Sequence, residues 1–303
     1  MPLFHPRVLK KALKNNPLVL SDTHKQILET WRISIENGQL FKQKEVSLHP
    51  HFVQKILIEV LGYQGFSATD TYSLYPEFPI GRGAVDIALG HFNQQSNQVI
   101  APFELKGAKT KDLEAIMPGR HKSPVQQAWE YGMDAIGAKW VLVSNYVELR
   151  LYAIGYGRQT YESWLFADLV NPAEYKRFIL LLSKENLLEG TTYRLLKESE
   201  QVDKEITDQL YQDYKALRYQ LIHTLKADNP AIDELDIIYY AQLILDRVLF
   251  IAFAEDTGLL PDNTHRSLKL NQGLAKSAKL LRWTLNRLPP EQNESMTFLC
   301  CWH

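Results

Sequence analysis

The chain has very little cysteine, no long apolar run and almost no net charge. Its 303 residues contain only two cysteines, the adjacent Cys300 and Cys301. This excludes a disulfide framework and a zinc site made of spaced cysteines. No apolar run approaches the roughly 18 residues that a membrane-spanning helix needs, and the N-terminus lacks the apolar stretch of a secretory signal. We therefore expect a cytoplasmic protein without a membrane partner.

The balance of charge is also informative. The formal net charge is -1, with 45% hydrophobic and 23% charged residues, which is typical of a globular chain with a sizeable core. Nothing in the net charge alone indicates a nucleic-acid partner. Any basic surface for such a partner must therefore be local and be offset by acidic side chains elsewhere.

Helical and strand-like patterns alternate in the first half of the chain. Ser21 and Asp22 are suitable N-caps for a helix that follows them, and a second helix is expected after Pro50, ending at Gly62. Alternating apolar patterns then predict strands at 84–90, 99–106, 140–145 and 147–152, with a helix at 123–137 between the second and third strand. This order predicts an α/β domain in which a mixed sheet is flanked by helices.

Beyond about residue 165 the strand patterns stop. Long helices are predicted at 172–188, 208–226, 234–260 and 274–288. We therefore expect a first domain at residues 1–170 and an all-helical region at 171–303. The stretch 197–205, which is polar and has no apolar periodicity, is the other place where we expect the boundary.

Charged residues interrupt two of the predicted strands. Asp86 lies in the middle of the first, and Glu104 and Lys106 share one face of the second, because side chains two residues apart on a strand point the same way. If the two strands are neighbours, two carboxylates and a lysine meet. Carboxylates so close repel unless a cation lies between them, and oxygen ligands favour magnesium or manganese.

Such a cluster suits the hydrolysis of a phosphodiester bond. A metal ion can activate water and stabilise the charge that develops on the phosphate, and Lys106 would help to place or deprotonate that water. A lone E-x-K triplet is weak evidence, since another occurs at Glu174 and Lys176. That second triplet lies in a helical pattern and has no acidic strand beside it.

These residues resemble the metal site of the PD-(D/E)XK nuclease superfamily, with an acid on one strand and E-x-K on the next. Gln127 and Tyr131 look like the Q-x-x-x-Y helix motif that follows this site in many members, and Glu45 stands where related proteins carry an upstream acid. The proline of the motif is missing, because Val85 precedes Asp86. The resemblance implies a PD-(D/E)XK-like mixed sheet.

The resemblance also implies roles for these side chains. Asp86 and Glu104 would bind Mg²⁺ or Mn²⁺, Lys106 would serve the attacking water, and Gln127 and Glu45 would assist as further catalytic residues. The loop after the second strand is basic. From it we expect DNA contacts by Lys109, Lys111, Arg120 and Lys122, and from the following helix by Tyr131. A merely solvated loop would explain the lysines equally well.

From about residue 40 to 262 the chain resembles the N-terminal part of type IIG restriction enzymes, which join such a nuclease domain to an adenine-N6 DNA methyltransferase. A methyltransferase needs a Gly-rich loop for S-adenosylmethionine and an N/D-P-P-Y/F loop, and the 303 residues contain neither. S-adenosylmethionine would therefore act only through a missing methyltransferase half. We expect the chain to be a truncated product or one half of a split system.

The sequence thus predicts a Mg²⁺-dependent endonuclease of a restriction-modification system, acting on double-stranded DNA. One site per chain would cut one strand, so a second copy would be needed to cut both. A separate methyltransferase or specificity chain is a further expected partner. The alternative is a non-catalytic DNA-binding or assembly fragment of a bifunctional methyltransferase-nuclease.

Overall fold

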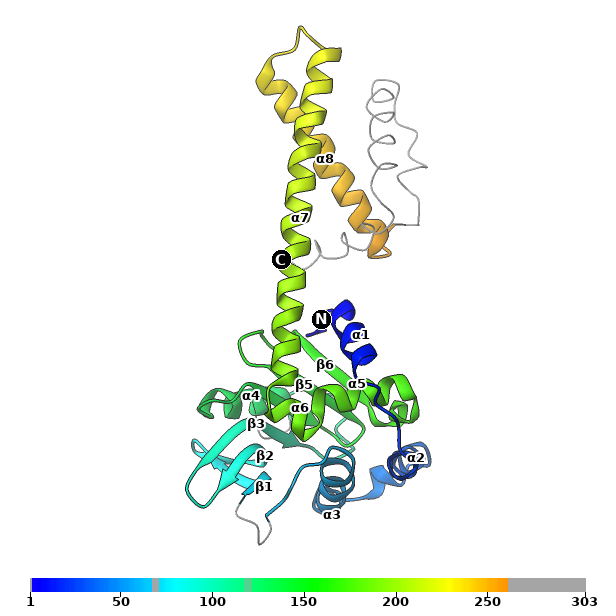
Figure 1. Ribbon diagram of the computed structural model, residues 1–303, viewed down its shortest axis with the longest axis vertical. Coiled ribbons are helices and arrows are strands. Elements are labelled where there is room, and N and C mark those ends of the chain that lie inside the picture. The colour runs from blue at the N-terminus through cyan, green and yellow to red at the C-terminus, as the bar shows by residue number, and fades with distance from the viewer. Residues whose placement is uncertain (1, 67–70, 118, 120, 261–303) are drawn as a thin grey trace. The chain divides into compact units, whose positions relative to one another are not determined.

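The computed structural model describes residues 2–66, 71–117, 119 and 121–260 (Figure 1). The chain divides into two compact units, Met1–Gln201 and Val202–His303. The first unit contains all strands of the described chain and the predicted site residues. It is described first.

Helices open unit 1. They are α1 (Pro6–Asn15), α2 (Asp22–Glu36), the short η1 (Leu40–Lys42), α3 (Glu45–Phe52) and the π-helix η2 (Val53–Val60). The Ser21 hydroxyl caps α2 by accepting from the His24 amide at 3.1 Å, as its sequence predicts. The helix expected after Pro50 begins earlier, at Glu45, so Pro50 lies inside it. Gly62, with φ of 78°, follows the end of η2.

Six strands form one mixed sheet in the order β1-β2-β3-β4-β5-β6. They are β1 (Thr71–Ile80), β2 (Gly83–Asn93), β3 (Asn97–Leu105), β4 (Trp140–Ser144), β5 (Glu148–Ala153) and β6 (Tyr161–Leu165). All neighbours are antiparallel except β3 and β4, which α4 (Pro124–Asp134) connects in parallel. The predicted α/β class with a mixed sheet flanked by helices is confirmed.

The two strands that the sequence did not predict lie at the edges of the sheet. β1 contains Pro76 and Pro79, which cannot donate to a ladder and are tolerated because β1 has a neighbour on one side only. β6 is a five-residue strand. An edge strand is hydrogen-bonded to a neighbour on one side only, so its composition carries a weaker strand signal.

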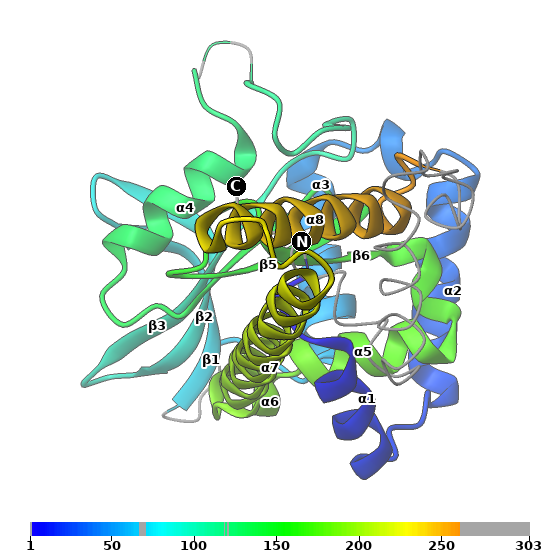
Figure 2. The same ribbon diagram turned by 90° about the horizontal axis from the view of Figure 1, so that it is seen from above.

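Different helices cover the two faces of the sheet. On one face, Val125 and Ala128 of α4 pack with Val141 and Val143 of β4. On the other face, the Phe52 ring at the end of α3 meets the Phe103 ring of β3 edge to face, at 6.1 Å between centroids. Figure 2 shows α4 separated by the strands from α2 and α5 (Pro172–Leu182).

The division between the units falls later than residue 170. After the short η3 (Phe166–Val170), α5 and α6 (Lys184–Leu188) belong to unit 1. The Tyr63 hydroxyl donates to the Leu182 carbonyl at 2.9 Å, and the His5 amide donates to the Ser199 hydroxyl of α7 (Thr191–Asp228) at 3.0 Å. These buried contacts tie the chain up to Ser199 to the sheet domain, so its predicted end at residue 170 is too early.

The division between Gln201 and Val202 falls within the polar stretch 197–205, the other boundary that the sequence predicted, although this stretch is helical. The stretch lies within the 38 residues of α7, because it holds no glycine or proline and consists mostly of good helix formers. In unit 2, the second half of α7 packs on α8 (Glu234–Asp256) through Leu221, Ala241 and Leu245. The predicted helix 274–288 and both cysteines lie outside the described residues.

The expectation that no apolar run is long enough to span a membrane is wrong for helix α8. The segment Glu234–Glu255 of α8 is long and apolar enough by length and composition, and 22% of its most apolar window is buried. Asp246 and Arg247 interrupt this segment. One such helix is weak evidence for a span, because the core helix of a soluble protein passes the same test.

Candidate active site

Asp86 and Glu104 lie side by side where the β2–β3 ladder ends. Ile87 pairs with Phe103 in this antiparallel ladder, so the next position outward sets Asp86 opposite Glu104. Beyond that point the Asp86 carboxylate replaces the strand partner, and its Oδ2 accepts the Leu105 amide at 2.6 Å. The expected pairing of the two charged strands is therefore present, and both acids leave the same face.

Glu104 is a buried carboxylate. It is 1% exposed and faces α4, since it pairs with Val143 across the parallel β3–β4 ladder. A buried charge is costly unless it is compensated. Here the Lys106 ammonium forms an ion pair with Glu104 Oε1, and the Gln127 amide donates to the same oxygen at 2.6 Å.

The helix α4 places Gln127. The Ser123 hydroxyl caps this helix by accepting the Gln126 amide at 3.1 Å, and the Val125 amide donates to the Leu113 carbonyl at 3.2 Å. One turn after Gln127, Tyr131 lies on the same helix face. Helix α4 therefore carries Gln127, which was expected to assist at the site, to the Glu104 carboxylate.

Tyr131 lies close to the same charges. Burial raises the pKa of its hydroxyl, and the carboxylates of Glu104 and Asp86 raise it further, while a hydrogen bond with Gln127 opposes them. A Cβ on Gly83 would lie 2.8 Å from the Tyr131 hydroxyl, so a larger residue there would displace the Tyr131 side chain. Tyr131 is half-buried against β1 and β2, which is a more enclosed place than a DNA-contacting residue was expected to have.

Glu45 approaches the site from the opposite helix layer. It is the first residue of α3, and a Cβ on Gly107 would lie 3.4 Å from its Oε2. Its carboxylate therefore lies next to the chain immediately after Lys106. Glu45 is exposed, whereas Glu104 is buried. The turn that was needed to bring Glu45 towards the strand end is present.

Tyr146 belongs to the same region, although no sequence pattern points to it. It lies in the turn between β4 and β5, with φ of 66°, and is completely buried. Burial raises the pKa of its hydroxyl, and the charges of Glu45 and Asp86 raise it further. In the sequence Tyr146 is simply an aromatic residue between two strand patterns, and nothing marks it as part of a site.

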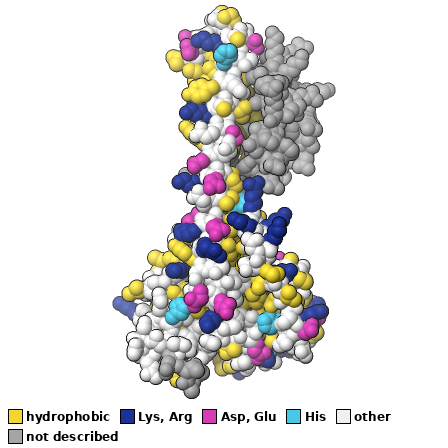
Figure 3. All heavy atoms as spheres, in the orientation of Figure 1, with side chains coloured by type: hydrophobic (Ala, Val, Ile, Leu, Met, Phe, Trp, Pro, Cys, Tyr) yellow, Lys and Arg dark blue, Asp and Glu magenta, His cyan; other side chains and the backbone are white. Residues whose placement is uncertain are grey.

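The predicted DNA-contacting lysines occupy a loop beside the site. Lys109 and Lys111 are exposed, and Lys122 forms an ion pair with Glu130 of α4. Arg120 lies outside the described residues. Figure 3 shows basic and acidic side chains interspersed on the drawn face, in keeping with the small net charge.

The donor set fits a magnesium-type cation. Asp86 and Glu104 offer carboxylate oxygens only, and Mg²⁺ is commonly held by one or two carboxylates together with waters and substrate phosphate. Among the described residues no three His, Cys, Asp or Glu side chains gather in a way that could hold a metal. The two carboxylates thus fit a cation that is shared with water and phosphate.

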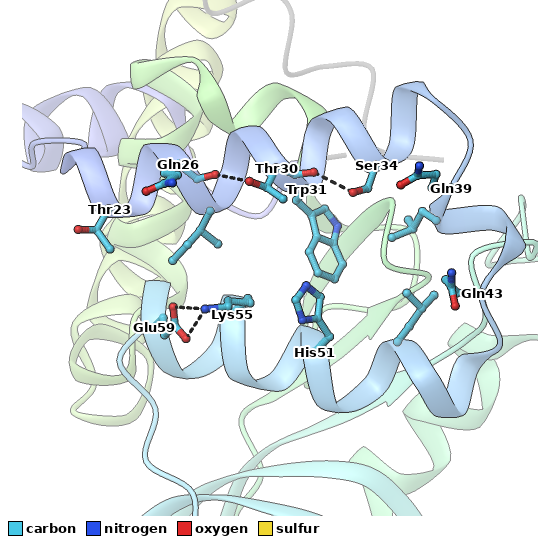
Figure 4. A pocket seen from close by; sticks show the side chains of 13 residues that line it. Thr23, Gln26, Thr30, Trp31, Ser34, Gln39, Gln43, His51, Lys55 and Glu59 are labelled. Atoms are coloured by element: carbon cyan, nitrogen blue, oxygen red, sulfur yellow. Dashed lines mark hydrogen bonds and ion pairs between the residues drawn. The ribbon is translucent and has the colours of Figure 1, made fainter.

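A cavity of about 450 Å³ lies elsewhere in unit 1, between α2 and the α3–η2 segment (Figure 4). The Trp31 indole and the His51 imidazole stack in its wall, at 5.6 Å between centroids. Lys55 and Glu59 form an ion pair at 2.8 Å beside them. None of the predicted site residues lines this cavity.

Comparison with known proteins adds no relative. No protein-family model matches the chain, and no curated protein or solved structure shows significant similarity to it. The functional argument therefore rests on the residues themselves.

Proposed function

We propose that unit 1 is a Mg²⁺-dependent DNA endonuclease domain of the PD-(D/E)XK type, from a restriction-modification system. The observation that carries the proposal is the convergence of Asp86, Glu104 and Lys106 at one end of the β2–β3 ladder, with Gln127 on Glu104. A purely structural role would not require two carboxylates and a lysine at the end of a strand ladder.

Each side chain has a chemical task in this proposal. Asp86 and Glu104 would hold the cation, which supplies charge for the phosphate and lowers the pKa of water. Lys106 would orient the attacking water and offset negative charge on the scissile phosphate. The water oxygen bonds to phosphorus as the bond to the leaving oxygen breaks, and the water loses its proton while the leaving oxygen gains one.

Gln127 would keep the Glu104 carboxylate in place, since it donates to Oε1 beside Lys106. Glu45 would act from the α3 side of Gly107. The exposed Lys109 and Lys111 suit contacts with the phosphates of double-stranded DNA. Cutting both strands would take two copies, and methylation with S-adenosylmethionine would take a separate methyltransferase half. We place the enzyme in the cytoplasm.

The test is Mg²⁺-dependent nicking of supercoiled plasmid by the purified chain. Asp86→Asn removes a charged ligand of the cation, and Lys106→Ala removes the group that orients the attacking water. Each should lower the nicking rate at least about 100-fold. Lys176→Ala is the matched control, because Lys176 ends the other E-x-K triplet and lies on α5. It should nick at the wild-type rate.

Folded wild-type protein that nicks no plasmid with Mg²⁺ or Mn²⁺ would contradict the enzyme proposal. If the same protein then bound DNA, the non-catalytic assembly fragment would be the better description. Nicking that survives in Asp86→Asn would place the activity outside this site.

A further inference from the structure

The hydroxyl of Tyr146 is buried without a hydrogen-bond partner in the described part of the chain. The residue is completely buried, and no described atom accepts from or donates to its Oη. A buried hydroxyl left unpaired costs free energy that a phenylalanine would not incur. The ring packs edge to face on Phe52 at 5.3 Å between centroids, so packing explains the ring and leaves the hydroxyl unexplained.

The backbone of Tyr146 is held firmly in an unusual conformation. Its φ of 66° lies in the left-handed region, which residues other than glycine and asparagine rarely adopt. The Ser144 hydroxyl accepts its amide at 3.0 Å, and the Trp31 indole donates to its carbonyl at 2.9 Å. Backbone conformations of this kind cost energy and persist where surrounding contacts hold them.

The sheet register brings this residue to the candidate site. Leu105 pairs with Ser144 across the parallel ladder, and the Lys106 amide donates to the Ser144 carbonyl at 2.8 Å. Tyr146 follows Ser144 by two residues, as Gly107 follows Leu105, so the two lie at the same end of β4 and β3. The Glu45 carboxylate lies next to Gly107. Burial raises the pKa of the Tyr146 hydroxyl, and the charges of Glu45 and Asp86 raise it further. The hydroxyl is therefore a protonated donor, unpaired among the described residues, at the end of the sheet that also holds these two acids.

We propose that Tyr146 is a positioning residue whose hydroxyl donates a hydrogen bond to a water molecule held between the Glu45 and Asp86 carboxylates, in the hydration shell of the divalent cation. The inference rests on the proposed function, since it assigns part of the same site. It accounts for the buried hydroxyl, the strained turn and the place of Glu45 in one arrangement. Magnesium keeps several of its waters when it binds to protein, so such a water is expected there.

The test is Tyr146→Phe, which removes the hydroxyl and keeps the ring. The variant should be as stable as the wild type or more so, because it loses no hydrogen bond within the described chain. Its kcat for plasmid nicking should fall about 3- to 10-fold, as for a lost hydrogen bond to a neutral water molecule, with KM for DNA unchanged. Mn²⁺ binding measured by calorimetry should weaken several-fold in the absence of DNA.

Tyr63→Phe is the matched control. Tyr63 is also buried, and its hydroxyl donates to the Leu182 carbonyl at 2.9 Å. This control should lose stability and keep the wild-type Mn²⁺ affinity and kcat. Glu45→Gln changes an exposed side chain and should fold normally. It should weaken Mn²⁺ binding as Tyr146→Phe does.

The outcomes separate the two proposals. Wild-type nicking with unchanged kcat and Mn²⁺ affinity in Tyr146→Phe would overturn the role of Tyr146 and leave the nuclease standing. A clear loss of stability in Tyr146→Phe, with kcat unchanged, would show a structural hydroxyl and overturn it as well. A wild-type chain that neither binds Mn²⁺ nor nicks DNA would overturn the proposed function, and this inference with it.

Discussion

At the scale of single residues, the arrangement depends on the buried ion pair between Glu104 and Lys106. The two side chains are 1% and 9% exposed, so water screens the pair very little. Removing one partner from such a pair leaves an uncompensated charge in a place of low polarity, and this is far more damaging than breaking an exposed pair. The catalytic lysine of the proposal is therefore also a structural one.

Lys106→Met should lower the free energy of unfolding by about 3–5 kcal/mol, because the buried Glu104 carboxylate then lacks the ammonium that compensates it. Lys55→Met is the matched control. It removes the partly exposed ion pair with Glu59, in which the Lys55 and Glu59 side chains are 38% and 30% exposed, and should cost at most about 1 kcal/mol. Urea unfolding followed by circular dichroism measures both. Equal losses in the two variants would contradict the buried ion pair.

At the scale of elements, the sheet and α4 decide where the chemistry lies. The sequence predicted that Asp86 and the E-x-K triplet lie on two successive strands, because alternating apolar residues define a strand face, and the connecting loop allowed these strands to be neighbours. It also predicted α4, whose cap Ser123 is a recognisable signal. Both predictions depend on local patterns and are confirmed as secondary structure.

Other parts of the site could not be predicted from local patterns. The approach of Glu45 to Gly107 depends on how α3 packs against the opposite face of the sheet. Tyr146 joins the site through the parallel β3–β4 register, and parallel pairing leaves no trace in the sequence of either strand. The edge strand β1 was missed because its prolines oppose a strand prediction, and only its edge position makes them harmless.

At Gly132, helix α4 approaches strand β4 closely. A Cβ there would meet Val141 Cγ2 at 2.4 Å, so the helix could not keep its distance from β4. Gly132→Ala should cost about 1–3 kcal/mol of stability and lower plasmid nicking, because Gln127 moves away from Glu104 with the helix. Met133→Ala, at an exposed position of the same helix, should change neither property. Wild-type nicking by Gly132→Ala would contradict the positioning role of α4.

At the scale of the whole molecule, the predicted site residues that the structure describes belong to the unit Met1–Gln201. Helix α7 carries the chain from this unit into the second. The boundary at residue 170 was misplaced because α5 and α6 look like part of the helical region in sequence, although contacts such as Tyr63 to Leu182 bind them to the sheet domain. Helical composition alone does not show which core a helix joins.

The central claim is that Asp86 and Glu104 share one divalent cation. Calorimetric titration of the full chain with Mn²⁺ tests it directly, without DNA and without turnover. The account predicts one Mn²⁺ per chain, with affinity reduced at least about 10-fold in Glu104→Gln, since a charged ligand is replaced by a neutral one. Glu174→Gln, which alters the other E-x-K triplet on α5, should bind as the wild type does. Equal Mn²⁺ affinity in the wild type and Glu104→Gln would contradict the claim.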